Sequence, residues 1–362
     1  MSETTRGLLL CGGYGRRLWP YTTWMPKALM PVLDKPLLIY TIERFRQAGI
    51  TEIAVNSLNN IAELRHCLGD GSDLGVRITY FPEPFQLGTG GILHHIADFW
   101  GDSTLVVSVG DMVSTVDLAD MIDFHRGHRA AATVACLEHP WALEEFGGDV
   151  AVLEPGTTRV AEYQWKPLGA AKSRLASSGT WIFEPRVRPV IPEPIDASAI
   201  PEAVDLNRDV MPTLTVAPDL GLHAFVSAHD FEDFGLPERF IEGSLRSLSG
   251  DFGILPHMEK NPDGNYIHAT ADLAADVVLE GVVLVDRDAV LAEGVHIVGP
   301  CVIGAGSVIE AGAVVRESVV LPGARIGRDS VVLHSLIGDS LRTTEAVKDY
   351  YWSGSSRPQA KR

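Results

Sequence analysis

Residues 285–303 read VDRDAVLAEGVHIVGPCVI, and an aliphatic side chain returns at every sixth position of this stretch. The same period runs from residue 267 to residue 332 with one short step of five, and each of its twelve positions holds Ile, Leu or Val. An α-helix repeats every 3.6 residues and a strand every two, so neither explains a period of six. The positions are Ile267, Leu273, Leu279, Val285, Leu291, Ile297, Ile303, Ile309, Val315, Leu321, Ile326 and Val332.

A triangular coil does explain this period, because each of its flat sides points one aliphatic side chain inward. The fifth place of each six-residue unit agrees, since it is small or β-branched in ten of the twelve units. The pattern resembles the left-handed parallel β-helix of hexapeptide-repeat proteins. We therefore predict a β-helix of about four coils over residues 267–338, with a linker over 251–266 and a tail over 339–362.

Residues 1–250 show a different pattern, in which short apolar runs alternate with segments of helical spacing. This alternation predicts an α/β domain with a Rossmann-like, mostly parallel mixed sheet and flanking helices. Ligands of such sheets bind beyond the carboxyl ends of the strands. The expected strands cover residues 8–11, 52–56, 77–81 and 104–109, and the expected helices cover 35–48, 61–68, 90–99 and 205–214.

The composition limits the possible partners and locations. The chain has 362 residues, of which 47 are acidic and 30 basic, and its formal net charge of −17 disfavours a nucleic acid as partner. Its four cysteines lie far apart without a C-x-x-C pair, so we expect neither a disulfide framework nor a zinc site, and a cytoplasmic location. We expect no membrane span, because no run of 18 apolar residues occurs. Any anionic ligand must therefore meet basic residues gathered locally.

The loop after the first expected strand gathers such residues. Residues 10–17 read LCGGYGRR, and Pro26 and Lys27 follow. Glycines let backbone N–H groups approach a phosphate closely, while Arg16, Arg17 and Lys27 supply positive charge. The spacing G-x-x-x-x-G-K-[ST] is absent, so this is not a Walker loop. The basic residues favour a triphosphate-binding loop over a plain tight turn.

This loop resembles the opening motif of the sugar-1-phosphate nucleotidylyltransferases, L-A-G-G-x-G-[TS]-R-L-x-P followed by P-K. Residues 86–91 (QLGTGG) resemble the family's base-binding turn, Gly110-Asp111 its metal site and Lys166-Pro167 its E-K-P motif. Ser178-Gly179 stands where the family has N-A-G, and residues 231–237 (FEDFGLP) stand where it has W-x-D-x-G-T-P. The resemblance covers nearly the whole chain, because a subset of the family, including many mannose-1-phosphate guanylyltransferases, also ends in a left-handed β-helix.

The resemblance implies an enzyme that transfers a nucleoside monophosphate from a nucleoside triphosphate to a sugar 1-phosphate and releases pyrophosphate. Charge neutralisation and alignment should dominate catalysis, because the reaction joins two polyanions. By motif position the expected catalytic cations are Arg17, Lys27 and Lys166, and the expected Mg²⁺ ligands are Asp111 and Asp233. The expected nucleotide contacts are Leu10, Gly12, Gly13, Gly15, Arg16, Gln86, Gly88 and Thr89, and the expected sugar-phosphate contacts are Gly147, Glu162, Ser178 and Gly179.

The chain departs from the family pattern near the expected sugar pocket. Arg16 replaces a Ser or Thr, Trp165 replaces the Glu before Lys166, and Ser177-Ser178 replaces Asn-Ala. The last two changes remove polar contacts to a hexose. They favour a less hydroxylated acceptor, such as an unsaturated cyclitol 1-phosphate of the valienol type used to assemble pseudosugar antibiotics. The Leu-Gly-Thr form of the turn and the β-helix favour a purine triphosphate, with GTP ahead of ATP.

Two other functions stay open at this point. One is a catalytically silent regulatory subunit that binds nucleotide sugars, although the intact phosphate loop and both carboxylates favour catalysis. The other is an acyltransferase activity in the β-helix, which contains His268, His296 and His334 but no recognisable acyl-carrier motif. Taken singly, Asp111 could also be a helix cap, and each lysine a surface residue. We further expect a homo-oligomer, a dimer or a tetramer, formed through the aliphatic ends of the β-helix.

Overall fold

The computed structural model describes residues 4–139, 148–195, 203–217, 219–338, 340–341 and 346–348. The chain forms two compact units. The first unit comprises residues 1–13 and 40–231, and the second comprises residues 14–39 and 232–362. By their contacts, residues 14–39 and 232–249 group with the β-helix. Within the part of the chain that the structure describes, no helix combines the length and apolar character needed to cross a bilayer.

The first unit is built on a mixed sheet, for which the described residues supply nine strands. Its parallel half has β1 (Thr5–Leu10) between β4 (Glu52–Ser57) and β6 (Thr104–Val109), with β5 (Arg77–Pro82) beside β4. These are the four strands expected from the apolar runs. In the other half, β11 (Leu175–Phe183) runs antiparallel to β6 and to β8 (Ala132–Glu138). The sheet is completed by β9 (Val150–Leu153), β10 (Val160–Gln164) and β12 (Leu222–Val226).

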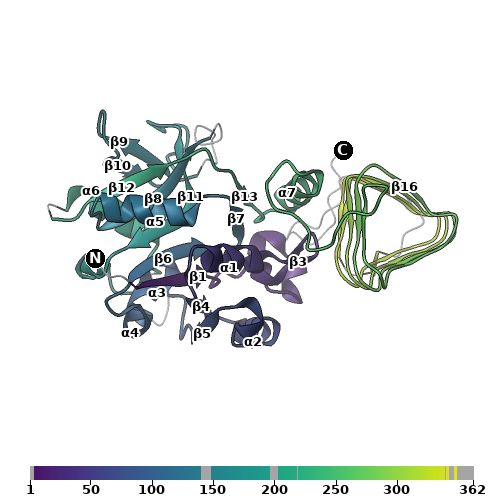
Figure 1. Ribbon diagram of the computed structural model, residues 1–362, viewed down its shortest axis with the longest axis horizontal. Helices are drawn as coiled ribbons and strands as arrows, with labels where there is room; N and C mark the ends of the chain where they lie inside the picture. Colours follow the sequence, from purple (N-terminus) through teal and green to yellow (C-terminus); the bar gives the residue numbers. More distant parts are fainter. Residues whose placement is uncertain are drawn as a thin grey trace. The chain divides into compact units, whose positions relative to one another are not determined.

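Helices connect the strands, as the alternating pattern predicts (Figure 1). Phe45 of α1 packs on β1 at Gly7, where a Cβ atom would lie 2.5 Å from the Phe45 ring, so this close approach of helix and sheet requires glycine. The expected helix at 90–99 is two short helices, α3 and α4, and the expected helix at 205–214 is a π-helix (Leu206–Val210) followed by α6. The first unit contains α1 (Leu37–Gln47, whose first turn belongs to the second unit), α2 (Ile61–Leu68), α3 (Gly88–His95), α4 (Ala97–Trp100), α5 (Leu118–Gly127), α6 (Met211–Val216), β7 (Met112–Ser114) and the 3₁₀ turns Ser72–Leu74 and Pro185–Val190.

The β-helix of the second unit consists of three parallel sheets, each with five strands among the described residues. Figure 1 shows the β-helix along its axis, so that the triangular cross-section of its coils is visible. One sheet contains β14 (Tyr266–Ile267), β17 (Val283–Val285), β20 (Cys301–Ile303), β23 (Val319–Val320) and β26 (Leu336–Ile337). The second contains β15 (Asp272–Leu273), β18 (Val290–Leu291), β21 (Val308–Ile309), β24 (Arg325–Ile326) and β27 (Ser340–Leu341). The third contains β16 (Val278–Glu280), β19 (His296–Val298), β22 (Val314–Arg316), β25 (Val331–Leu333) and β28 (Ala346–Lys348).

The strand register confirms the six-residue period and corrects one position. Val285 pairs with Ile303, and Ile303 pairs with Val320 rather than with Leu321. The short step of five residues therefore falls between Val315 and Val320, one unit earlier than the sequence pattern suggested. The corner in this step contains Glu317, whose φ of 45° is left-handed.

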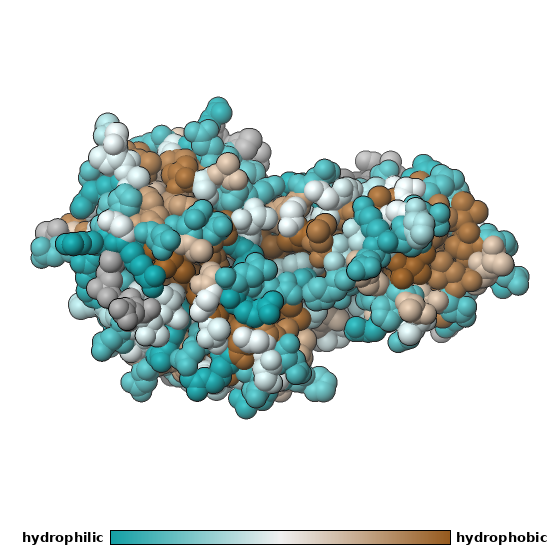
Figure 2. All heavy atoms as spheres, in the orientation of Figure 1, coloured by the Kyte–Doolittle hydropathy of each residue, from teal (hydrophilic) through white to brown (hydrophobic). Residues whose placement is uncertain are grey.

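The first coil of the β-helix is less covered than the rest. Ile267, Leu273 and Leu279 point at the core but are only partly buried, whereas Val285, Leu291 and Ile297 are almost completely buried. Val278, in the same coil, has 47% of its surface exposed. On the face drawn in Figure 2, apolar residues also reach the surface over the β-helix.

The other elements of the second unit are short, apart from one helix. Helix α7 (Pro237–Ser249) packs against β20, β23 and β26. Tyr21 donates a hydrogen bond of 2.8 Å to the carbonyl oxygen of Leu336 and so ties the segment 14–39 to the β-helix. The short elements are the 3₁₀ turns Arg16–Leu18, Tyr21–Thr23 and Lys27–Leu29, the strands β2 (Pro31–Val32) and β3 (Lys35–Pro36), and β13 (Phe231–Asp233), which begins in the first unit.

Candidate functional site

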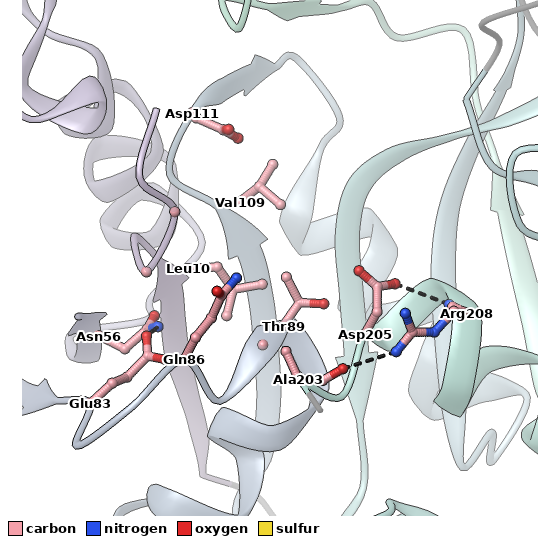
Figure 3. A pocket seen from close by; sticks show the side chains of 13 residues that line it. Leu10, Asn56, Glu83, Gln86, Thr89, Val109, Asp111, Ala203, Asp205 and Arg208 are labelled. Atoms are coloured by element: carbon pink, nitrogen blue, oxygen red, sulfur yellow. Dashed lines mark hydrogen bonds between the residues drawn. The ribbon is translucent and has the colours of Figure 1, made fainter. Parts of the chain in front are cut away.

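A cavity of about 360 Å³ opens at the carboxyl ends of the parallel strands in the first unit. Leu10 ends β1, Asn56 lies at the end of β4, and Val109 ends β6. The edge of a parallel sheet is where such folds bind ligands. The cavity is lined by Leu10, Gly12, Gly13, Asn56, Glu83, Gln86, Gly88, Thr89, Val109, Asp111, Ala203, Asp205 and Arg208 (Figure 3). Seven of these residues were predicted from the sequence, namely Leu10, Gly12, Gly13, Gln86, Gly88, Thr89 and Asp111.

A hydrogen-bonded chain holds one wall of the cavity together. Cys11 N–H donates to Asn56 Oδ1 at 3.2 Å, and Asn56 Nδ2 donates to Glu83 Oε1 at 2.6 Å. Leu87 N–H donates to Glu83 Oε2 at 2.9 Å. Glu83 therefore links the loop after β1, the end of β4 and the turn before α3, and its buried carboxylate has a partner for each oxygen.

The turn over residues 86–89 packs tightly against the segment before the π-helix. Gly88 has a φ of 82°, and a Cβ atom there would lie 2.4 Å from the carbonyl oxygen of Val204. Thr89 Oγ1 accepts a hydrogen bond of 2.8 Å from Leu206 N–H. Gln86, by contrast, is exposed at the cavity. The turn thus fixes its glycine and threonine by packing and leaves the Gln86 amide available to a ligand.

The Cys11 thiol lies close to the carboxylates of Asp111 and Glu83, and Gly110 packs against it. Burial, together with the negative charges of Asp111 and Glu83, raises the pKa of Cys11 to about 12. Cys11 is therefore a neutral packing residue rather than a nucleophile. A Cβ atom at Gly110 would lie 2.5 Å from Cys11 Sγ, so the Gly-Asp pair predicted as a metal motif needs its glycine to bring Asp111 to the strand end.

Trp165, Lys166 and Arg208 form a cation–aromatic group at the same unit's surface. Lys166 Nζ lies 5.4 Å and the Arg208 guanidinium carbon 5.9 Å from the centroid of the Trp165 ring. Arg208 also lines the cavity, and its guanidinium donates to Ala203 O at 2.9 Å. Lys166 N–H donates to Asp149 Oδ1 at 3.2 Å. Burial raises the pKa of Asp149 to about 6, and the nearby charge of Asp205 acts in the same direction.

The residues predicted to contact the sugar phosphate differ in their burial and in their partners. Gly179 has a φ of 71°, and a Cβ atom there would lie 2.7 Å from Val109 of the cavity wall. Ser178 is buried and its Oγ lies 2.9 Å from His229 Nε2, so its side chain is engaged inside the protein. Burial lowers the pKa of His229 to about 4. Glu162 forms an ion pair of 2.8 Å with Lys172, while Gly147 lies outside the described residues.

The second unit assembles a separate group around Asp233. Its carboxylate lies 4.0 Å from Arg17 Nη2, 3.8 Å from Lys27 Nζ and 3.5 Å from Arg239 Nη1. Gly235 N–H also donates to Asp233 Oδ1 at 2.8 Å. A Cβ atom at Gly235 would lie 2.6 Å from Arg17 Nη2 and 2.9 Å from Lys27 Nζ, so glycine makes room for the cations. The three cationic side chains thus share one acidic partner.

The phosphate-loop residues of the second unit are ordered by local contacts. Gly15 has a φ of 63° and caps the 3₁₀ turn that contains Arg16 and Arg17. Thr22 Oγ1 donates to Gly15 O at 3.0 Å. The Arg16 guanidinium stacks 4.8 Å from the centroid of the Tyr14 ring. Arg17 keeps 61% of its side chain exposed, so it can reach an incoming anion.

The chemistry of the two carboxylates predicted as metal ligands suits Mg²⁺ better than a transition metal. Asp111 and Asp233 offer carboxylate oxygens, which hard cations prefer, and Mg²⁺ is commonly held by one or two carboxylates plus substrate phosphates. Across the residues described here, no cluster of three or more His, Cys, Asp or Glu side chains could bind a metal ion. Two histidines of the β-helix have local partners, since His296 pairs with Glu280 at 2.9 Å and His268 with Thr270 at 3.0 Å. The buried Nδ1 of His334 has no hydrogen-bond partner among the described residues.

The sequence patterns missed several polar residues of the two groups. Asn56 lies near the end of β4, and Glu83 directly follows β5. A search for polar residues after every parallel strand, rather than after the first and fourth alone, would have found both. Asp205, Arg208 and Arg239 carried no comparable signal, because their positions depend on how distant segments pack.

The comparison with protein families gives two matches. The nucleotidyl transferase model matches residues 6–249, and the GMPPB C-terminal domain model matches residues 279–348. The first match covers the cavity and the cationic group, and the second covers most of the β-helix. Both parts of the chain are therefore similar to known families.

Individual relatives resemble the chain over most of its length. It is 31% identical to a mannose-1-phosphate guanylyltransferase of Mycobacterium tuberculosis, over 86% of this chain and 82% of the relative. It is 30% identical to a UTP–glucose-1-phosphate uridylyltransferase of Synechocystis, over 92% of this chain and 87% of the relative. A crystal structure from Bacillus anthracis, assigned as a glucose-1-phosphate thymidylyltransferase, superposes with a TM-score of 0.60 at 22% identity, covering 70% of this chain and 97% of that one. This last likeness supports the fold alone.

Proposed function

The chain belongs to the nucleotidyl transferase family, and we propose that it joins a nucleoside triphosphate to a sugar or cyclitol 1-phosphate and releases pyrophosphate. The observation that carries this proposal is the cavity at the strand ends, which holds seven of the residues expected from the family motifs. The names of relatives that use sugar 1-phosphates support the same reaction class.

In this proposal the chain acts by neutralising and aligning phosphates rather than by forming a covalent intermediate. Arg17 holds the triphosphate and the departing pyrophosphate, and Lys27 stabilises the charge at the α-phosphate. Lys166 binds the incoming sugar phosphate, whose oxygen attacks the α-phosphorus in line. Backbone N–H groups of Gly12, Gly13 and Gly15 donate to phosphate oxygens, because these positions carry no side chain in the way.

Mg²⁺ is the proposed cofactor, and Asp111 and Asp233 are its proposed ligands. When bound, the ion would screen the charge of the phosphates and favour the in-line geometry. The oxygen-only donor set supports this assignment. Asp233 would then exchange part of its contact with Arg17 and Lys27 for the metal, which leaves both cations for the nucleotide.

The finer substrate assignment is GTP, with ATP second, and a cyclitol 1-phosphate as acceptor. Trp165 supports the acceptor assignment, because 43% of its surface is exposed and it presents an apolar face flanked by Lys166 and Arg208. The buried Ser177 supports it too, since this shorter side chain stands where the family has the polar Asn. A role in antibiotic biosynthesis would follow from such an acceptor.

The proposed assembly is a homo-oligomer formed through the first coil of the β-helix. The partly buried Ile267, Leu273 and Leu279 support this, because contiguous apolar surface marks interaction sites. Light scattering that reports a monomer would refute it. All four cysteines are free thiols, which supports the expected cytoplasmic location.

Pyrophosphate release tests the enzyme assignment directly. The wild-type protein is incubated with Mg²⁺, each of five nucleoside triphosphates, and glucose, mannose or valienol 1-phosphate. We expect release that needs both substrates, and a fall of about 10²- to 10³-fold in kcat/KM for Arg17→Ala and for Asp111→Asn. The exposed Arg287→Ala and Asp73→Asn provide matched controls and should leave the rate unchanged.

Each outcome of this assay has a defined meaning. A strong preference for glucose or mannose 1-phosphate would end the cyclitol assignment and leave the reaction class intact. Full activity in both site variants would refute the assignment of Arg17 and Asp111. The absence of release with every pair of substrates would instead support a silent, nucleotide-sugar-binding subunit.

A further inference from the structure

Asp149 lies directly beside Lys166, yet the proposed chemistry gives this acid no role. The two residues meet through the sheet of the first unit, in which β9 lies between β10 and β11. Gln164 of β10 pairs with Val150 of β9 in antiparallel register. Asp149 precedes Val150 and Trp165 follows Gln164, so the same register, continued past the strand ends, brings Asp149 to the segment that carries Lys166.

The main chain of Asp149 is held in place by the neighbouring strands. Val150, the next residue, is completely buried, and it pairs with Ala176 of β11 as well as with β10. Ser177 N–H of β11 donates to the carbonyl oxygen of Asp149 at 2.9 Å. The side chain of Asp149 therefore starts from a backbone that the sheet fixes.

The backbone of Lys166 adopts a conformation that needs support. Its φ of 39° lies in the left-handed region, which residues other than glycine seldom adopt. Pro167 follows it, and a residue before proline favours an extended backbone instead. A conformation of this kind persists only where the surrounding contacts hold it.

Asp149 supplies such a contact. Lys166 N–H donates to Asp149 Oδ1 at 3.2 Å. Burial raises the pKa of Asp149 to about 6, while the hydrogen bond from Lys166 N–H and the Lys166 ammonium charge act in the opposite direction. The carboxylate therefore interacts with both the main chain and the charged end of the residue that is proposed to bind the sugar phosphate.

The side chain of Lys166 is linked to the strand-end cavity through its neighbours. Lys166 Nζ lies 5.4 Å from the centroid of the Trp165 ring, and the Arg208 guanidinium carbon lies 5.9 Å from the same centroid. Arg208 also lines the cavity. A change in the backbone at Lys166 would therefore displace an ammonium group and an aromatic ring together, relative to the cavity wall.

We propose that Asp149 is a positioning residue for the acceptor substrate: its carboxylate holds the left-handed backbone of Lys166 and so directs the ammonium group toward the phosphate of the sugar or cyclitol 1-phosphate. This inference rests on the proposed nucleotidyl transfer. Asp149 acts through Lys166 rather than on the substrate itself. Because alignment of the two substrates is a main source of rate in such a reaction, displacement of Lys166 should impair use of the acceptor and spare binding of the triphosphate.

The nearest alternative is that Asp149 only stabilises the fold. A smaller folded fraction lowers the measured kcat and leaves the KM of both substrates unchanged, whereas displacement of Lys166 raises the KM of the acceptor alone. Two substitutions separate these roles. Asp149→Leu removes the hydrogen-bond acceptor and fills a similar volume, whereas Asp149→Asn keeps an acceptor oxygen and removes the charge.

The experiment measures kcat and KM of the full chain for the triphosphate and for the acceptor that the wild-type protein uses best. For Asp149→Leu we expect kcat/KM of the acceptor to fall about 10- to 100-fold, mainly through KM, with the KM of the triphosphate unchanged. Asp149→Asn should restore the acceptor KM to near the wild-type value. Asp70→Leu is the matched control, because Asp70 Oδ1 accepts a hydrogen bond of 3.0 Å from Ser72 N–H in another loop, and it should change neither KM.

A double-mutant cycle tests whether Asp149 acts through Lys166. Lys166→Ala should by itself lower kcat/KM of the acceptor. Adding Asp149→Leu to Lys166→Ala should cause little further loss, because no ammonium group is left to position. Losses that multiply in the double variant would show that Asp149 acts independently of Lys166 and would overturn the inference.

The outcomes distinguish this inference from the function on which it rests. If the wild-type protein releases no pyrophosphate from any pair of substrates, the proposed function itself fails. If the wild type is active but Asp149→Leu changes the KM of both substrates equally or of neither, or if Asp149→Asn loses as much as Asp149→Leu, the inference is wrong and the reaction class stands. A thermal melt shows whether each variant is folded; if Asp149→Leu does not fold, Asp149→Ala, which also lacks the acceptor oxygen, is judged by the same criteria.

Discussion

The strand-end cavity and the β-helix depend on opposite properties of their sequences. In the β-helix the inward positions need only an aliphatic side chain of suitable size, and Ile, Leu and Val exchange freely along each stack. In the cavity the decisive positions are glycines, where one added carbon would lie 2.2 Å from Glu83 or 2.4 Å from Val204. A fold can thus be specified by a repeated class of side chain, whereas a binding site is specified by individual atoms.

The largest effect on stability is expected in the β-helix. Ile297 is completely buried in its core. Ile297→Ala should lower the free energy of unfolding by about 2–5 kcal/mol, because it removes buried methyl groups and leaves a cavity. Urea unfolding measures the change, and kcat per folded molecule should stay at the wild-type value. Val278→Ala, at a half-exposed position of the same unit, should cost far less; equal losses in the two variants would contradict the core assignment.

A smaller effect on stability should separate two neighbouring glycines of the cavity loop. Gly12→Ala places a Cβ atom against Glu83, whereas a Cβ atom at Gly13 has no neighbour within 4 Å. We expect Gly12→Ala to cost about 1–3 kcal/mol through overpacking and Gly13→Ala to leave stability nearly unchanged. Thermal unfolding without nucleotide measures both. Loss of activity in Gly13→Ala would then report contact with the nucleotide alone, while equal destabilisation by the two changes would refute the steric argument.

The smallest expected effect on stability concerns Asp149 and depends on pH. Asp149 has a pKa of about 6 in the folded protein, above its ordinary value of 3.8. The folded state therefore takes up a proton more readily than the unfolded state, and the contribution of Asp149 to stability rises as pH falls from 6 to 4 and is lost above pH 6. Asp149→Asn keeps an acceptor for Lys166 N–H and removes the charge. We expect it to raise stability by about 1–2 kcal/mol at pH 7 and to have little effect at pH 4; the opposite trend in denaturant titrations would show that burial does not set this pKa.

The two regions also differ in how far the sequence predicts them. The period of six located the β-helix and nearly every inward residue, because each coil repeats the same local requirement. It misplaced one step, since Val320 and Leu321 are both apolar and the pattern could not show that the shorter step falls at the corner that contains Glu317. The four parallel strands were predicted for a similar reason, as each contains a short apolar run.

The cavity was predicted only where a motif is contiguous. The turn at 86–89 and the loop at 10–13 are short stretches, and three residues of each line the cavity. Glu83 and Asn56 were not predicted, because they are joined by a hydrogen bond between residues 27 positions apart, which no contiguous motif shows. Arg239 was missed because it joins the other cations only through the start of α7, next to the loop that carries Asp233.

Asp233 affects how an anion would bind to the cationic side chains of the second unit. Three positive groups held within a few ångströms would push each other apart, and one carboxylate keeps them together. The protein therefore carries its own counter-ion at this cluster. In the proposed reaction, an arriving polyphosphate would replace one negative partner with another instead of assembling the cluster from scattered side chains. Such an exchange makes the strength of capture sensitive to ionic strength, and it leaves the acid ready to take back the cations when the product departs.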